Sequence, residues 1–121
     1  MALGWSQSAQ SIPEIDSVEE CTAVLEQEIA VLFKHSPTCP VSWMAHREMM
    51  QFRSQQPDVP LYLVSVRRRR DISRFIAENT GIQHESPQVI VFRRGKAVAS
   101  TSHDEITADA VCGFLATQTT P

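Results

Sequence analysis

A single cysteine, Cys39, stands where the sequence predicts that a strand ends and a helix begins. The apolar run 29–33 precedes it, and a helical pattern of apolar residues follows it. Pro40 suits the first position of a helix, which needs no backbone N–H donor. Backbone N–H groups at a helix start carry partial positive charge and favour a thiolate over a thiol. The sequence therefore predicts that Cys39 is a nucleophilic, redox-active thiol.

No second cysteine stands beside Cys39. Ser42 occupies the place, three residues on, where a dithiol redox site has its other thiol. Cys21 and Cys112 fall on the apolar faces of two predicted helices, which favours small core side chains, although either could be a distant resolving thiol. A buried and inert Cys39 is the alternative. We prefer a reactive one because α/β proteins bind ligands at the carboxyl edge of their sheets.

Residues elsewhere in the chain could complete the site. His35 and His84 are candidate neighbours of the thiolate, where an imidazolium would stabilise it, or they are exposed loop histidines. Pro87 directly precedes a predicted strand. If its peptide bond is cis, the Ser86 carbonyl and the Gln88 backbone would face an extended thiol substrate. The local sequence leaves the cis and trans forms open.

Four consecutive arginines, Arg67 to Arg70, follow a second predicted strand. If that strand is parallel to the first, the run lies at the same sheet edge as Cys39. Its charge could stabilise a thiolate or hold the carboxylates of a small thiol, and a solvated loop is the alternative. The net charge of −3 and the lack of aromatic residues within the run disfavour nucleic acid. The four histidines and three cysteines lack zinc-type spacing, so we expect no metal site.

The elements that position these residues alternate along a chain of 121 residues, which suits one domain. A helix joins the first two strands, which should therefore be parallel, and the last two strands form a hairpin. We expect an α/β fold with a mixed four-stranded sheet flanked by helices on both faces. The domain should span residues 17–117 after a flexible segment, 1–16. The predicted helices are 17–28, 40–52, 71–79 and 107–116, and the predicted strands are 29–33, 61–66, 88–92 and 97–101. Ser17 as N-cap with Glu20 reaching back to it matches a capping box, Asp71 can cap the third helix, and Gly81 suits the left-handed position that follows this helix.

Composition limits the setting of the protein. No apolar segment approaches the 18 or so residues of a membrane span, so no membrane partner is expected. The first ten residues lack a basic start and a long apolar run, which disfavours a secretory signal. An odd number of cysteines without scaffold-like spacing favours a reducing, cytoplasmic location.

Two segments, residues 33–42 and 81–89, resemble the thioredoxin superfamily and, more closely, the monothiol bacilliredoxins of the bacillithiol redox system, first grouped as general stress proteins. The family motif Thr-Cys-Pro-Ile-Ser has Val41 in place of its isoleucine here. Residues 95–96 and 102–107 add to the likeness, which spans about residues 17–115. The arginine run is not part of it.

The resemblance implies a thioredoxin-like fold, with Cys39 as the redox-active residue and Pro87 as the cis-proline of the superfamily. It also implies exchange of a small thiol, bacillithiol or another, from mixed disulfides on S-thiolated client proteins, with no bound cofactor. A second small thiol or a separate reductase would release the thiolated Cys39. The residues expected to bind substrate or to stabilise the thiolate are Thr38, Pro40, Val41, Ser42, Ser86, Pro87, His35 and His84.

Two alternatives remain open. A thioredoxin-like module could bind partners without catalysis and use its thiol as a sensor. An iron–sulfur carrier of the monothiol glutaredoxin type is disfavoured, because the Cys-Gly-Phe-Ser signature of those proteins is absent.

Overall fold

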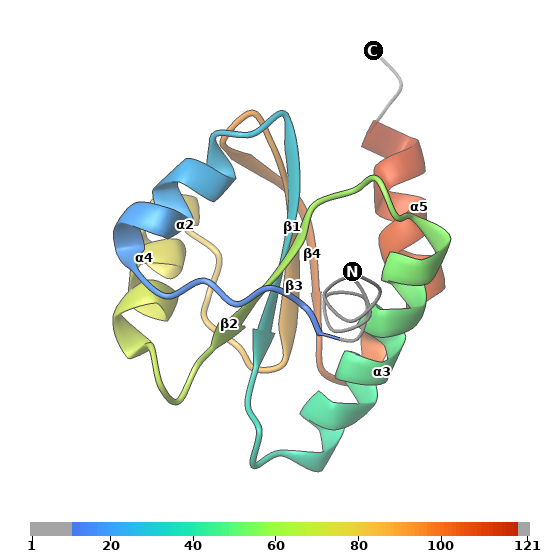
Figure 1. The fold of residues 1–121 in the computed structure, drawn as a ribbon, viewed down its shortest axis with the longest axis horizontal. Helices are drawn as coiled ribbons and strands as arrows, with labels where there is room; N and C mark the ends of the chain where they lie inside the picture. Colours follow the sequence, from blue (N-terminus) through green and yellow to red (C-terminus); the bar gives the residue numbers. More distant parts are fainter. Residues whose placement is uncertain (1–10, 119–121) are drawn as a thin grey trace, which may run out of the picture.

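The computed structural model describes residues 11–118, which form one sheet with helices on both of its faces (Figure 1). Among these residues no helix is long and apolar enough to cross a membrane. The elements follow in the order α2 (Val18–Leu25), β1 (Ile29–His35), α3 (Pro40–Gln55), β2 (Leu61–Ser65), α4 (Arg70–Thr80), β3 (Gln88–Arg93), β4 (Lys96–Ser102), the 3-10 turn η1 (His103–Glu105) and α5 (Ala108–Gln118).

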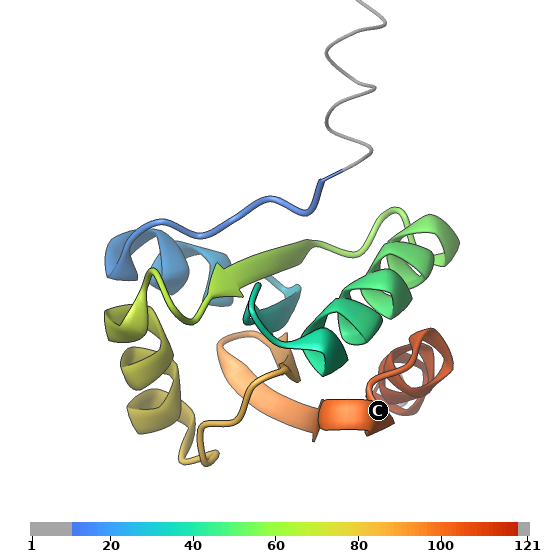
Figure 2. The same cartoon turned by 90° about the horizontal axis from the view of Figure 1, so that it is seen from below.

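The strand order is β2-β1-β3-β4. Strands β1 and β2 are parallel, whereas β3 is antiparallel to both β1 and β4. Helices α2 and α4 cover one face of this sheet, and α3 and α5 cover the other (Figures 1 and 2). The predicted mixed four-stranded sheet with helices on both faces is thereby confirmed.

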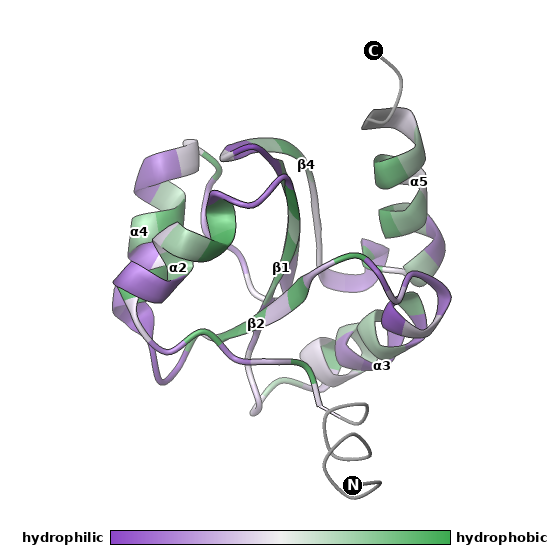
Figure 3. Ribbon diagram, turned by 45° about the horizontal axis from the view of Figure 1, so that its top comes forward, coloured by the Kyte–Doolittle hydropathy of each residue, from purple (hydrophilic) through white to green (hydrophobic). Residues whose placement is uncertain are grey.

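Strand β1 lies between two hydrophobic cores, which explains its unbroken apolar sequence. Val31 and Phe33 pack with residues of α3 and α5, whereas Ala30 and Leu32 pack with residues of α2 and α4. Figure 3 shows the hydrophobic colouring of β1, which runs between the two helix layers. The alternation continues to Lys34, which is fully buried. The end of β1 therefore carries polar side chains into the interior, close to the sheet edge where the candidate site lies.

The capping residues at the helix ends agree in part with those expected from the sequence. Ser17 caps α2 by accepting a hydrogen bond from the backbone N–H of Glu20 (3.0 Å), as predicted. The side chain of Glu20 accepts in turn from the N–H of Asp16 (2.8 Å), one residue before the expected partner. Gly81 ends α4 with φ of +75°, the left-handed conformation that a glycine adopts without a steric penalty.

The predicted cap of α4 is wrong. The structure places Asp71 inside the first turn, and Arg69 is the capping residue without a side-chain cap. The guanidinium of Arg69 binds the carboxylate of Asp71, with Nη2 and Oδ2 2.7 Å apart. This ion pair between neighbours at the helix start was not visible in the sequence pattern.

Packing begins before the predicted domain boundary at Ser17. Ile12 and Ile15 are buried in the two cores. The N–H of Ile15 donates to the carbonyl of Leu63 in β2 (2.9 Å), and the N–H of Leu63 donates to the carbonyl of Pro13 (2.8 Å). Residues 11–16 are thus part of the folded unit and not of a flexible segment. Residues 1–10 lie outside the described part of the chain.

Candidate thiol site

Cys39 is the N-cap residue of the 16-residue helix α3, directly before Pro40 at the first helical position. It is half-buried, and its carbonyl accepts the first helical hydrogen bond, from Trp43 N–H (3.2 Å). The sequence placed both residues correctly. The thiol itself makes no capping hydrogen bond to the helix. The start of α3 thus offers the sulfur the helix dipole but no formed hydrogen bond.

Ser42 is fully buried in the first turn of α3. Its Oγ atom accepts a hydrogen bond from the backbone N–H of Ser36 (2.9 Å) and lies 2.7 Å from Nδ1 of His35. The hydroxyl thus ties the end of β1 and the loop after it to α3. The position of a second redox cysteine is taken by a side chain with a structural role.

His35 is neither an imidazolium beside the thiolate nor an exposed loop histidine, the two alternatives that the sequence left open. It is only 5% exposed. Burial lowers its pKa to about 4, with a further contribution from His46 and an opposing one from the contact with Ser42. The ring is therefore neutral near pH 7. Its Nε2 atom is buried and has no hydrogen-bond partner among the described residues.

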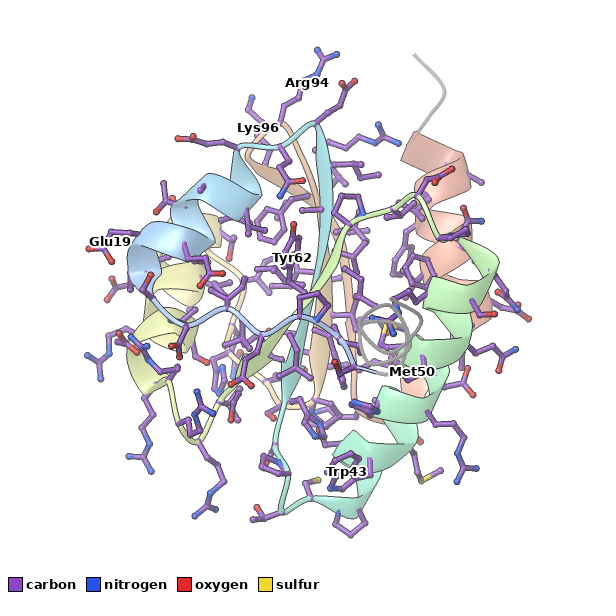
Figure 4. The ribbon with its side chains drawn as sticks, in the orientation of Figure 1. Glu19, Trp43, Met50, Tyr62, Arg94 and Lys96 are labelled. Carbon is purple, nitrogen blue, oxygen red and sulfur yellow. The ribbon has the colours of Figure 1, made fainter. Side chains whose placement is uncertain are left out.

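Trp43 and His46, one and two turns into α3, enclose the ring of His35. The ring of Trp43 stands edge-on to His35 at a centroid distance of 4.5 Å, and that of His46 lies 5.2 Å away. The indole N–H of Trp43 also donates to the carbonyl of Pro37 (2.8 Å), which fixes the loop before Cys39 (Figure 4). We missed both residues, although an aromatic residue and a histidine three positions apart after the cysteine could have indicated them.

The Ser86–Pro87 peptide bond is cis, as the resemblance implies. Because Gln88 at the start of β3 pairs with Lys34 near the end of β1, this bond lies at the same sheet edge as the loop that carries Cys39. Pro87 is buried, and its carbonyl accepts a hydrogen bond from His103 N–H (3.0 Å). The hydroxyl of Ser86 is buried without a hydrogen-bond partner among the described residues.

A buried ammonium group lies on the other face of β1. Lys34 Nζ donates to Gln88 Oε1 (2.7 Å), and burial lowers the pKa of Lys34 to about 8, against the opposing effect of Glu85. The side-chain amide of Gln88 in turn donates a hydrogen bond through Nε2 to the backbone carbonyl of Gln83 (3.0 Å). Partial burial and the charge of Lys34 lower the pKa of His84, against the opposing effect of Glu85, and the side chain is exposed, as in the second of the two alternatives for this residue. We missed the role of Lys34 because a lysine that ends an apolar strand is usually exposed.

The arginine run reaches the cysteine motif, as its predicted place on the sheet edge requires. Arg67 Nη1 lies 3.4 Å from the hydroxyl of Thr38, the residue before Cys39. Val41 and Met44, in the first turns of α3, are exposed beside the same loop. Within residues 11–118 no cluster of three His, Cys, Asp or Glu side chains is arranged to hold a metal ion.

The strand order, the cysteine that caps α3 and the cis-proline at the same edge define a thioredoxin-fold protein. A solved structure described as an oxidoreductase candidate with a thioredoxin fold is similar over 86% of this chain and 93% of its own, at 30% identity and a TM-score of 0.82. Thioredoxin from Trypanosoma brucei brucei covers 92% of this chain over 93% of its own, at 17% identity and a TM-score of 0.73. Mitochondrial thioredoxin 3 from Saccharomyces cerevisiae covers 88% over 94% of its own, at 18% identity and a TM-score of 0.68. The last two show likeness of fold.

The family is narrower than the fold. Residues 10–111 match the model of the monothiol bacilliredoxin BrxC family, and the chain belongs to that family. Membership implies a bacilliredoxin-like role in thiol–disulfide redox chemistry.

Proposed function

We propose that the protein is a monothiol–disulfide exchange enzyme that removes a small thiol from mixed disulfides on client proteins. The thiolate of Cys39 attacks the small-thiol sulfur. The new sulfur–sulfur bond joins that sulfur to Cys39, the old bond breaks, and the client cysteine leaves as a thiolate that takes up a proton. The thiolate of a second small thiol, or of a separate reductase, then attacks the small-thiol sulfur of the adduct and forms a new disulfide with it, and the bond to Cys39 breaks so that Cys39 leaves as a thiolate.

The observation that carries this proposal is the contrast between Cys39 and Ser42. The sulfur of Cys39 is partly exposed at a helix start, where the dipole favours it both as nucleophile and as leaving group. The hydroxyl three residues on is buried and engaged by Ser36 and His35. Cys39 therefore has no neighbouring thiol to resolve its adduct, and an external thiol must do so.

Family membership supports bacillithiol as the small thiol. The exposed side chains of Val41, Trp43 and Met44, all within the first turns after Cys39, offer apolar surface for a client segment. Ser86, next to the buried Pro87 on the facing loop, would border the same surface. We propose Thr38, Pro40 and Ser42 as residues that position the cysteine loop.

Turnover of a bacillithiolated client tests the proposal. We expect the wild-type protein to release the client thiol and to carry one small-thiol adduct, which intact mass spectrometry places on Cys39. Cys39→Ser should abolish both signals, whereas Cys21→Ser and Cys112→Ser should retain them. An internal disulfide to Cys21 or Cys112 would contradict the monothiol mechanism, and an adduct on Cys39 that never turns over would favour a redox sensor.

A further inference from the structure

The four consecutive arginines divide into two pairs by their partners. Arg68 forms ion pairs with Asp16 (3.2 Å) and Glu14 (3.4 Å), and Arg69 forms ion pairs with Asp71 (2.7 Å) and Asp16 (3.5 Å). These two guanidinium groups fasten the N-terminal segment and the start of α4. Their charge is neutralised locally, so they leave little attraction for a ligand.

The outer two arginines of the run are Arg67 and Arg70. Within residues 11–118, Arg67 and Arg70 make no ion pair with a carboxylate, and the same holds for Arg74. All three line one cavity of about 490 Å³. A cavity of this size is in the range that holds a small organic molecule. The lining residues are Val66, Arg67, Arg70, Ser73, Arg74, Ala77 and His84, with no acidic side chain among them.

Helix α4 presents this lining from one face. Its contributions, Arg70, Ser73, Arg74 and Ala77, follow the helical spacing i, i+3, i+4 and i+7. Two guanidinium groups one turn apart thus flank a single hydroxyl. Arginine binds carboxylates through two parallel hydrogen bonds, so this arrangement fits an anionic, planar group.

Ser73 provides a second, independent sign of a ligand. The residue is only 6% exposed, and its Oγ atom is buried without a hydrogen-bond partner among the described residues. Buried polar atoms are nearly always paired, because an unpaired one forfeits its hydrogen bonds to water. A ligand oxygen in the cavity would satisfy this hydroxyl.

The cavity adjoins the cysteine motif through Arg67. This side chain lines the cavity and also reaches Thr38, the residue before Cys39, with Nη1 3.4 Å from Oγ1. The loops after β1 and β2 lie at the same lower end of the molecule in Figure 1. A small molecule in the cavity can therefore extend past Thr38 toward the sulfur of Cys39.

We propose that this cavity, named here the arginine cavity, binds the carboxylates of the small thiol that forms the mixed disulfide with Cys39. The inference rests on the proposed function and adds its substrate class: thiols that carry carboxylates, in preference to neutral or cationic ones. Arg70 and Arg74 hold the carboxylates, Ser73 donates its hydroxyl hydrogen to one of them, and Arg67 lies between the cavity and the cysteine. The exchange chemistry at the sulfur is unchanged.

Rates of adduct formation on Cys39 test this proposal. The probes are symmetrical disulfides of different charge: bacillithiol disulfide and glutathione disulfide, which carry carboxylates, hydroxyethyl disulfide, which is neutral, and cystamine, which is cationic. We expect the double variant R70Q/R74Q to lower the rates with the two acidic disulfides, relative to hydroxyethyl disulfide, by about tenfold. The rate with cystamine, relative to the same neutral probe, should rise. Ser73→Ala should lower the acidic-to-neutral ratio by about threefold.

Arg94→Gln is the matched control, because Arg94 is an exposed arginine at the opposite end of the sheet (Figure 4). It should leave the ratio unchanged. Equal ratios for the wild type and R70Q/R74Q, with Cys39 still reactive toward every probe, would overturn the role of the arginine cavity and leave the proposed function standing. Failure of wild-type Cys39 to react with any probe would overturn both.

Discussion

Nδ1 of His35 and Oγ of Ser42 lie 2.7 Å apart, in the last residue of β1 and the first turn of α3. This contact joins the strand before Cys39 to the helix after it. Both residues are buried, and the same serine oxygen also accepts the N–H of Ser36. The geometry of the cysteine loop thus depends on a serine at the position where a dithiol site has its second cysteine.

Replacing Ser42 with alanine should destabilise the fold. The change leaves the N–H of Ser36 and the His35 ring without their acceptor or donor, at a cost of about 1–3 kcal/mol in the free energy of unfolding. Urea denaturation followed by tryptophan fluorescence measures this loss. Ser54→Ala, at an exposed position of the same helix, is the control and should change stability by less than about 0.5 kcal/mol. Equal effects of the two changes would disprove the bracing role.

The stability of the protein should fall as the pH drops from about 6.5 to about 4. The pKa of His35 is lowered to about 4 in the folded state, so the unfolded chain binds the proton more readily across this interval. Above about pH 6.5 the neutral His35 makes its full contribution to the free energy of unfolding. This contribution is lost as the pH falls from about 6.5 to about 4. The shift corresponds to about 3 kcal/mol. His46, which faces His35 and also has a lowered pKa, titrates in the same direction.

Urea midpoints measured between pH 7.5 and pH 4 separate the contribution of His35 from that of the carboxylates. His35→Asn should flatten the profile relative to the wild type. The control is His103→Asn, because His103 is exposed and its φ of +57° is one that asparagine tolerates. A profile that His35→Asn leaves as steep as before would show that His35 is not the titrating group.

Replacing either of two glycines, Gly81 or Gly113, with alanine should change the free energy of unfolding, in opposite directions for the two positions. Gly81 ends α4 at φ of +75°, where a Cβ atom is strained although no atom lies within 4 Å of it. Gly81→Ala should therefore lower the free energy of unfolding by about 1 kcal/mol. Gly113 lies inside α5 with open space around it, so Gly113→Ala should raise the same quantity by about 0.5–1 kcal/mol. Thermal unfolding of the two variants measures both changes, and shifts of the same sign would contradict the assignment.

The three cysteines should react with iodoacetamide in a fixed order under native conditions. Cys39 should be labelled first because it is partly exposed at the start of α3. Cys112 should follow, since it is also partly exposed but lies within reach of Gln55 and Gln56. Cys21 should react last: it is fully buried, and burial raises its pKa to about 11. Peptide mapping over a time course checks the order, and early labelling of Cys21 would show that the α2 core opens readily.

Local patterns predicted the fold and the place of the cysteine, because each depends on neighbours in the chain. The apolar run of β1, the proline after Cys39 and the glycine after α4 all act within a few residues. Long-range packing decided the rest. The neutral state of His35 depends on Trp43 and His46, which reach it from the next helix.

The arginine run shows the same limit of sequence reasoning. Because the four side chains are identical and consecutive, the sequence could not indicate which of the arginines form ion pairs and which do not. Arg68 is neutralised by Glu14 and Asp16, from a segment that we expected to be flexible. Within residues 11–118, Arg67 in the loop before α4 and Arg70 in its first turn make no ion pair with a carboxylate, and both line a cavity with no acidic residue. Only the tertiary structure separates the two pairs.

The segment before α2 also changes what strand β2 can do. β2 is the outermost strand on its side, and such a strand can template pairing with another copy of the chain. Here the backbone of residues 13–15 occupies both hydrogen-bonding groups of Leu63, at the centre of β2, while Arg68 and Arg69 hold Asp16 just beyond. At this position the outer margin of the sheet is therefore already paired within the chain and is closed to a strand from another copy.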